Sequence, residues 1–79
     1  MKVTVYSKPA CPQCFMVKRL LDDKGIKYEE IDSLDSEETI PMLKEKYKAS
    51  QLPVTLIEKE DKETVIIGNR VTELREAIA

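Results

Sequence analysis

Ser7-Lys8-Pro9-Ala10-Cys11-Pro12-Gln13-Cys14 joins a short strand pattern to a helical pattern and holds both cysteines of the chain. In a Cys-x-x-Cys that opens a helix, the first thiol lies over the free backbone N–H groups of the first turn, which stabilise a thiolate. The thiolate is the attacking species in disulfide exchange, so we expect Cys11 to be the nucleophile and Cys14 the resolving partner. Pro12 agrees with this, because the first helical position needs no N–H and suits the fixed φ of proline.

The cysteine pair has two other interpretations, a metal site and a structural disulfide. A structural zinc site needs four nitrogen or sulfur ligands, and two cysteines without any histidine cannot supply them in one chain. A metal site shared across a dimer stays open. A structural disulfide closing so small a loop would remove little entropy from the unfolded chain, so we favour redox chemistry.

The absence of histidine also restricts the chemistry of the first cysteine. A cysteine hydrolase with a histidine base is excluded. Activation of Cys11 must therefore come from the helix terminus and from cations such as Lys8.

Length and charge predict one small domain over residues 1–79, which would bury about 60% of its unfolded surface. With 35% charged residues and a net charge of −2, the chain lacks the basic character of a nucleic-acid interface. No stretch is long enough to span a membrane, and the N-terminus enters a strand pattern without the features of a signal peptide. We expect a cytoplasmic protein, where thiols are kept reduced and a Cys-x-x-Cys is more readily catalytic than structural.

Hydrophobic periodicity predicts the element order β-α-β-α-β-β-α. The first two strands, joined through a helix, should be parallel with a right-handed crossover, and the last two should form an antiparallel hairpin. Helices on both faces would give three layers. The expected strands are 2–7, 26–32, 52–58 and 63–67, and the expected helices are 12–24, one ending near 47, and 71–79.

The second helix carries mixed signals at its start. Asp35, three residues before Glu38, predicts a capped N-terminus, whereas Pro41 should disturb the first turns. Its second half is basic. We interpret these lysines as a solvated face that complements the helix dipole; the alternative is that they attract an acidic partner. The lysines concerned are Lys44, Lys46 and Lys48.

Phe15 lies beside the cysteines, off the apolar stripe of its helix. It either covers a neighbouring loop or contacts a partner protein.

The element order, with Cys-Pro-Gln-Cys after the first strand and Leu52-Pro53-Val54 before the third, resembles the thioredoxin superfamily and its small glutaredoxin-like members. Within these the chain is most similar to the NrdH-type redoxins, from residues 3–11 through 13–14, 18–20 and 25–26 to 51–54. The resemblance implies a thioredoxin/glutaredoxin-like α/β three-layer sandwich with a four-stranded mixed sheet.

The resemblance also implies a set of site residues. Cys11 attacks, Cys14 resolves, and Pro53 is a cis-proline beside the disulfide, although an X-Pro bond taken alone is cis in only about 5% of cases. The backbone of Leu52 would then be free to pair with an extended substrate. The other implied substrate-binding residues are Lys8, Pro12, Gln13 and Gly68.

The segment after the hairpin differs from the corresponding segments of NrdH-type redoxins and of glutathione-using glutaredoxins. NrdH-type redoxins carry Trp-Ser-Gly-Phe-Arg there, and this chain has Ile66-Ile67-Gly68-Asn69-Arg70, in which only the glycine and the arginine match. Glutathione-using glutaredoxins carry paired glycines followed by acidic residues. Gly68 also has a plain structural interpretation, since a turn from strand to helix often needs positive φ.

The implied activity is that of a monomeric dithiol oxidoreductase with a redox-active Cys11–Cys14 disulfide and no bound cofactor or metal. It would take electrons from thioredoxin reductase and NADPH and reduce protein disulfides, ribonucleotide reductase first among them. A glutathione-dependent glutaredoxin is the alternative within the same chemistry. From other classes, the alternatives are an iron–sulfur or metal carrier that uses Cys11 in a shared dimer site, and an interaction module that has kept the fold.

Overall fold

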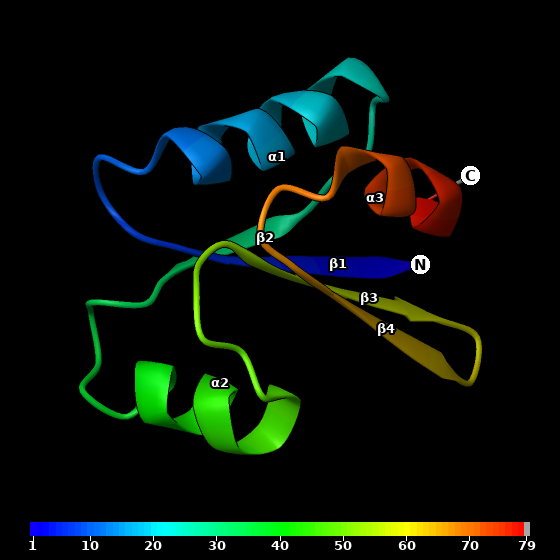
Figure 1. Ribbon diagram of the computed structural model, residues 1–79. Coiled ribbons are helices and arrows are strands. Elements are labelled where there is room, and N and C mark those ends of the chain that lie inside the picture. The colour runs from blue at the N-terminus through cyan, green and yellow to red at the C-terminus, as the bar shows by residue number, and fades with distance from the viewer. Residues whose placement is uncertain (79) are drawn as a thin grey trace.

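The computed structural model describes residues 1–78, and the last residue of the predicted third helix, Ala79, lies outside them. Within this range the elements follow the predicted order (Figure 1). They are β1 (Lys2–Ser7), α1 (Pro12–Asp23), β2 (Glu29–Asp32), α2 (Thr39–Tyr47), β3 (Val54–Lys59), β4 (Lys62–Ile67) and α3 (Val71–Ile78).

The four strands form one mixed sheet in the order β2-β1-β3-β4. β1 pairs in parallel with β2, while β3 is antiparallel to both β1 and β4. The predicted parallel pair and the predicted hairpin are therefore confirmed. Because α1 follows β1 directly, the loop that leads to Cys11 lies at the carboxyl end of β1, which is an interior strand of the sheet.

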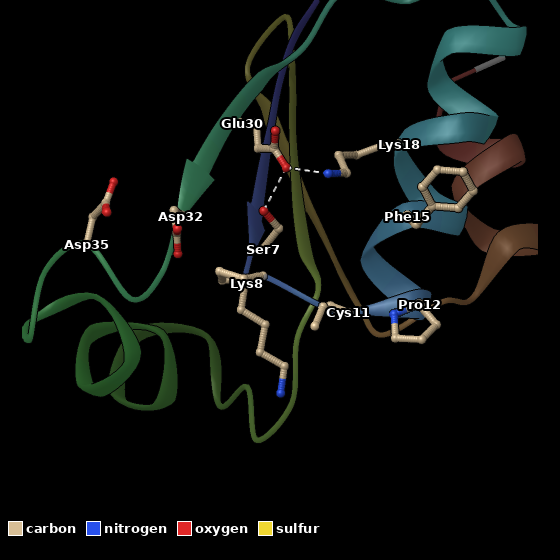
Figure 2. Close-up of a pocket in the computed structure, with 11 residues that line it drawn as sticks. Ser7, Lys8, Cys11, Pro12, Phe15, Lys18, Glu30, Asp32 and Asp35 are labelled. Carbon is tan, nitrogen blue, oxygen red and sulfur yellow. Dashed lines mark hydrogen bonds and ion pairs between the residues drawn. The ribbon is translucent and has the colours of Figure 1, made fainter.

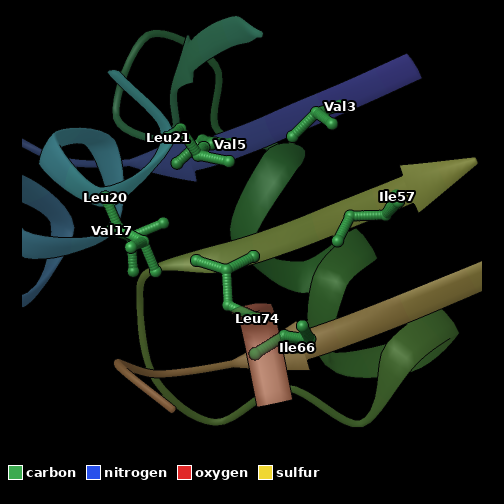
Figure 3. Close-up of a cluster of buried hydrophobic side chains, with 8 residues drawn as sticks. All are labelled: Val3, Val5, Val17, Leu20, Leu21, Ile57, Ile66 and Leu74. Carbon is green, nitrogen blue, oxygen red and sulfur yellow. The ribbon is translucent and has the colours of Figure 1, made fainter. Parts of the chain in front are cut away.

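Helices cover both faces of the sheet, with α1 and α3 on one face and α2 on the other (Figure 1). The alternation of β1 explains this. Val3 and Val5 point to α1, and Tyr6 packs under α2. The larger core, between the sheet and α1 with α3, is drawn in Figure 3 and consists of Val3, Val5, Val17, Leu20, Leu21, Ile57, Ile66 and Leu74. The smaller core under α2 consists of Leu43, Ala49 and Val54.

β2 is shorter than the sequence pattern predicted, and its predicted start at residue 26 is wrong. Gly25 has a φ of 68°, and the N–H of Ile26 donates to the carbonyl of Leu21 at 2.9 Å, so both residues still belong to the turn that ends α1. Pairing begins only where Glu29 meets Thr4.

The hairpin is displaced slightly from its predicted bounds. β3 starts at Val54 rather than at residue 52, because its ladder with β1 begins where Val54 meets Tyr6. β4 starts one residue early, at Lys62, because Lys62 still pairs with Lys59 at the turn.

The capping predicted for α2 is wrong. Glu38 is the N-cap and makes no side-chain capping hydrogen bond; the polar side chains that accept backbone N–H groups lie earlier, at Asp32 and Ser36. Pro41 is the third residue of α2, where the backbone N–H has no partner within the helix, so it does not interrupt the hydrogen bonding of the first turn. None of the helices within residues 1–78 is long and apolar enough to cross a membrane.

Candidate functional site

Cys11 is the N-cap of α1, in an extended conformation with φ −115° and ψ 101°. The backbone N–H of Cys14 donates to the Cys11 sulfur at 3.2 Å, and the N–H of Phe15 donates to the Cys11 carbonyl at 3.1 Å. Pro12 follows as the first helical residue. The sequence therefore places the sulfur of Cys11 at the positive end of the helix, where backbone N–H groups favour a negative charge.

Cys11 and Cys14 form a disulfide, with their Cα atoms 5.2 Å apart. The two residues differ in exposure: Cys11 is partly exposed, whereas Cys14, in the first turn of α1, is 1% exposed. A substrate disulfide can reach the first sulfur, while the second sulfur can react only with a partner already bonded to the first. The order in which Cys11 attacks and Cys14 resolves requires such an asymmetry, and the order itself stays a prediction.

The loop before the cysteines takes an unusual backbone path. Ala10 has a φ of 54°, in the left-handed region that residues with a Cβ seldom adopt. Nothing in the sequence indicated this conformation, since neither glycine nor asparagine stands there. The turn brings Lys8 and Cys11 to the wall of one open pocket.

This pocket of about 750 Å³ lies beside Cys11 (Figure 2). Pro12, Phe15 and Lys18 of α1 border one side of it, and Asp32 and Asp35 border the other. Phe15 is 61% exposed, and its ring borders this pocket. The complete lining is Ser7, Lys8, Pro9, Ala10, Cys11, Pro12, Phe15, Lys18, Glu30, Asp32 and Asp35.

A polar network forms the inner wall of the pocket (Figure 2). Lys18 Nζ donates to Glu30 Oε2 at 2.6 Å, and Ser7 Oγ donates to the same oxygen at 2.9 Å. The hydrogen bond from Lys18, followed by that from Ser7, lowers the pKa of the Glu30 carboxyl below its ordinary 4.5. The hydrogen bond with Glu30 in turn raises the pKa of Lys18 above its ordinary 10.5. The residue pattern did not predict this network, because the contacts depend on the parallel register of β1 and β2.

The Leu52–Pro53 peptide bond is cis, as the resemblance implied. Pro53 is buried, and its carbonyl accepts the N–H of Gly68 at 2.7 Å. Within residues 1–78, Leu52 lies outside the ladder of β3, and no backbone hydrogen bond of the loops uses its N–H or its carbonyl. The pairing of the Leu52 backbone with an extended substrate, which the resemblance implies, stays a prediction.

Gly68 has a φ of 81° and is buried against the loop before β3. A Cβ at this position would lie 3.0 Å from Nε2 of Gln51. The structure therefore brings Leu52, Pro53 and Gly68 together, and it places Lys8 and Pro12 on the pocket of Cys11. Gln13 is exposed on the first turn of α1 and does not line that pocket.

Comparison with known proteins points to one family. The glutaredoxin family model matches residues 3–61. N-acetyl-S-hydroxy-L-cysteine reductase of Bacillus subtilis (strain 168) is 34% identical over 55 residues, covering 70% of this chain and 59% of that protein. The Gene 56 protein of Mycobacterium phage D29 is 33% identical over 52 residues, covering 66% of this chain and 58% of that protein. The chain thus spans less than two thirds of the length of either curated relative.

Solved structures agree over almost the whole chain. The thioredoxin-like protein BC3987 superposes with a TM-score of 0.81 at 29% identity, covering 96% of this chain and 99% of that protein. The NrdH-redoxin from Escherichia coli also superposes with a TM-score of 0.81, at 26% identity, covering 96% of this chain and 93% of that protein. The fold and the resemblance inferred from the sequence are therefore confirmed, and the chain belongs to the glutaredoxin family.

Proposed function

We propose that this chain is a thiol–disulfide oxidoreductase that reduces protein disulfides through Cys11 and Cys14. The observation that carries the proposal is the pairing of an accessible sulfur at the N-terminus of α1 with a buried one, 1% exposed, a turn further on. Membership of the glutaredoxin family and the likeness to an NrdH-redoxin support it.

The reaction runs in two exchanges. The Cys11 thiolate attacks one sulfur of the substrate disulfide, and the other substrate sulfur leaves as a thiolate that takes up a proton. Cys14 then loses its proton and attacks the Cys11 sulfur of the mixed disulfide, which releases the second substrate thiol. The substrate gains two electrons and two protons, and the protein becomes the Cys11–Cys14 disulfide seen in the structure.

We further propose thioredoxin reductase with NADPH as the electron donor and ribonucleotide reductase as the acceptor, with the chain acting as a cytoplasmic monomer. The likeness to the NrdH-redoxin from Escherichia coli supports this choice. The segment after β4 argues against a glutathione site of the usual kind, because a single glycine, Gly68, is followed by Asn69 and Arg70 instead of a second glycine and acidic residues.

The test follows NADPH oxidation with insulin as the disulfide, in parallel with thioredoxin reductase and with glutathione plus glutathione reductase. Each assay has a control without this protein. We expect turnover with thioredoxin reductase alone. Turnover with glutathione alone would assign the chain to the glutathione-dependent glutaredoxins, and inactivity in both assays would contradict the proposed reductase role for these donors.

A further inference from the structure

An unpaired hydroxyl lies on an interior strand of the sheet. Thr55, on β3, is 0% exposed, and its Oγ1 has no hydrogen-bond partner within residues 1–78. A buried hydroxyl without a partner destabilises the folded state, and the large majority of such groups in proteins are paired. The exceptions include groups with a redox or catalytic role. The other such hydroxyl of the described chain, on Ser33, follows β2 and lies outside the strand ladders.

The strand register places the Thr55 side chain on the face that α1 and α3 cover. Thr55 pairs with Val5 of β1 and with Ile66 of β4. Directly opposed residues of an antiparallel pair point to the same face of the sheet. Val5 and Ile66 both belong to the core under α1 and α3 (Figure 3). The Thr55 hydroxyl is therefore enclosed between the sheet and these helices.

Cys14 lies on the inner side of α1, at the same end of the sheet as Thr55. The buried residues of α1 include Cys14 and Val17, which are one turn apart and face the sheet. Cys14 is nearer the start of the helix, which adjoins the carboxyl end of β1 (Figure 1). Because β3 runs antiparallel to β1, its second residue, Thr55, is also at that end. The buried sulfur and the unpaired hydroxyl thus share one layer of the protein.

This layer offers the hydroxyl few other partners. The core cluster under α1 and α3 consists of apolar side chains. The buried hydroxyl of Ser7 donates to Glu30 Oε2 at 2.9 Å. The backbone of β3 is paired on both sides, with β1 and β4. Of the polar side-chain atoms buried in this layer within residues 1–78, the sulfur of Cys14 is therefore the acceptor that remains.

Cys14 presents a different acceptor in each redox state. In the disulfide its sulfur is bonded to Cys11 and carries no charge. When Cys14 resolves a mixed disulfide, it must first become a thiolate. A hydroxyl that donates to a charged acceptor forms a stronger hydrogen bond than one that donates to a neutral acceptor. A donor in this layer therefore stabilises the thiolate while leaving the disulfide unaffected.

We propose that the Thr55 hydroxyl donates a hydrogen bond to the Cys14 thiolate and so accelerates the resolving step. In that step the Cys14 thiolate attacks the Cys11 sulfur of the mixed disulfide, and the bond between Cys11 and Cys14 forms. The substrate sulfur leaves as a thiolate, which takes up the proton that Cys14 lost. Thr55 keeps its own proton throughout. The inference rests on the proposed reductase function and adds a residue to its second exchange.

Three variants separate the effect of the hydroxyl from the packing of the side chain. Thr55→Val replaces the hydroxyl by a methyl group of similar volume, and Thr55→Ser keeps the hydroxyl. Thr4→Val makes the same change at a threonine that is 5% exposed on β1, between Val3 and Val5 and therefore on the opposite face of the sheet. Because the Thr55 hydroxyl is unpaired in the disulfide form, oxidised Thr55→Val should unfold at the same urea concentration as the oxidised wild type or at a higher one.

The probe is a capped peptide, acetylated and amidated, whose single cysteine is joined to 2-thiopyridine as a mixed disulfide. Cys11 of the reduced protein attacks the peptide sulfur and releases 2-thiopyridone, whose absorbance gives the rate of the first exchange. Acid quenching and mass spectrometry then follow the decay of the adduct between Cys11 and the peptide, which is the resolving step. No reductase is present, so the result does not depend on the electron donor.

We expect Thr55→Val to release 2-thiopyridone at the wild-type rate, while its adduct decays about five-fold more slowly. A hydrogen bond to a charged group changes an equilibrium by about ten- to hundred-fold. A thiolate stabilised in this way is also a weaker nucleophile, which offsets about half of the gain on a logarithmic scale. Thr55→Ser should restore the decay to within about two-fold of the wild type, and Thr4→Val should match the wild type in both exchanges.

Several results would overturn the inference, and they can be distinguished from a failure of the proposed function. Equal adduct decay in Thr55→Val and the wild type, or equal slowing in Thr55→Val and Thr4→Val, would disprove the role of the Thr55 hydroxyl and leave the reductase function intact. Slow decay that Thr55→Ser does not restore would assign the effect to packing. Failure of the wild-type protein to release 2-thiopyridone, with the Cys11 thiol shown to be free, would contradict the proposed function and the inference with it.

Discussion

Cys11 is partly exposed and Cys14 is 1% exposed, so single substitutions should separate their roles. Cys11→Ser should abolish insulin reduction, because the buried sulfur of Cys14 cannot reach a substrate disulfide. Cys14→Ser should retain the first exchange and stop there, leaving a mixed disulfide between Cys11 and the substrate. Mass spectrometry after mixing with a peptide disulfide measures this adduct.

The control for these variants is the reduced wild-type protein, which should release its substrate and show no lasting adduct. A stable adduct on Cys14 in Cys11→Ser, formed as fast as the adduct on Cys11 in Cys14→Ser, would contradict the assigned order of attack.

Gly68 has a positive φ and a close neighbour, the side chain of Gln51. A pair of alanine variants can distinguish the cost of the backbone conformation from the cost of the contact. Gly68→Ala would force a side chain into a φ of 81° and bring its Cβ within 3.0 Å of the Gln51 amide. Gly25→Ala faces a φ of 68° with nothing within 4 Å. Each should lose about 1 kcal/mol from the left-handed backbone, measured as the free energy of unfolding in urea.

The Gln51 contact is with the end of a flexible side chain, which can move away at little cost. We therefore expect the two variants to lose similar stability. A loss in Gly68→Ala that exceeds the loss in Gly25→Ala by several kcal/mol would show instead that the loop before β3 cannot adjust.

At the scale of the elements, the Lys18–Glu30 ion pair joins α1 to β2 beside the active-site pocket. Because the folded state lowers the pKa of Glu30 below 4.5, its stabilising effect is present above about pH 4.5 and is lost as the pH falls through the folded value. The raised pKa of Lys18 acts in the opposite direction. Its effect is present below about pH 10.5 and is lost as the pH rises through the folded value.

Glu30→Gln should therefore destabilise the protein between these limits and become equal to the wild type in acid. The Glu30 side chain is 42% exposed, so solvent screens the pair, and we expect a loss of only about 0.5–1 kcal/mol at neutral pH. Thermal unfolding of both proteins from acid to alkaline pH measures this difference. Glu29→Gln, on the same strand but without an ion pair within residues 1–78, is the control and should track the wild type.

The elements also show which features could be predicted from sequence. Periodicity identified β1 and α1 almost to the residue, because each buries one regular face. It misplaced the start of β2, where a hydrogen bond decides the boundary: the carbonyl of Leu21 accepts the N–H of Ile26. Such contacts depend on how the chain has already turned, and the residue pattern does not encode them.

The candidate site divides in the same way. Its two cysteines and its helix N-terminus follow from the local sequence. The cis bond before Pro53 was predicted only from the resemblance, because the sequence alone favours a trans bond at most X-Pro positions. The Lys18–Glu30 contact could not be predicted from the local sequence, because it depends on the strand order and on the register of β1 and β2.

At the scale of the whole molecule, the chain has little stability to lose. A domain of 79 residues is expected to have a free energy of unfolding of about 4–12 kcal/mol. Leu21 is fully buried where α1 packs on the sheet (Figure 3). Replacing a buried leucine by alanine costs about 2–5 kcal/mol, so Leu21→Ala removes a large part of that total.

We expect Leu21→Ala to lower the urea midpoint strongly while the slope of the transition stays unchanged, which indicates a loss of native stability alone. Leu34→Ala makes the same substitution at a side chain that is 60% exposed and should shift the midpoint little. Because Cys11 caps α1 and Cys14 lies within it, the activity of Leu21→Ala at rising temperature should disappear together with its folded structure, and not before it. Activity lost while circular dichroism still reports the folded state would mean that Leu21 also holds the cysteines in register with the cis-proline loop.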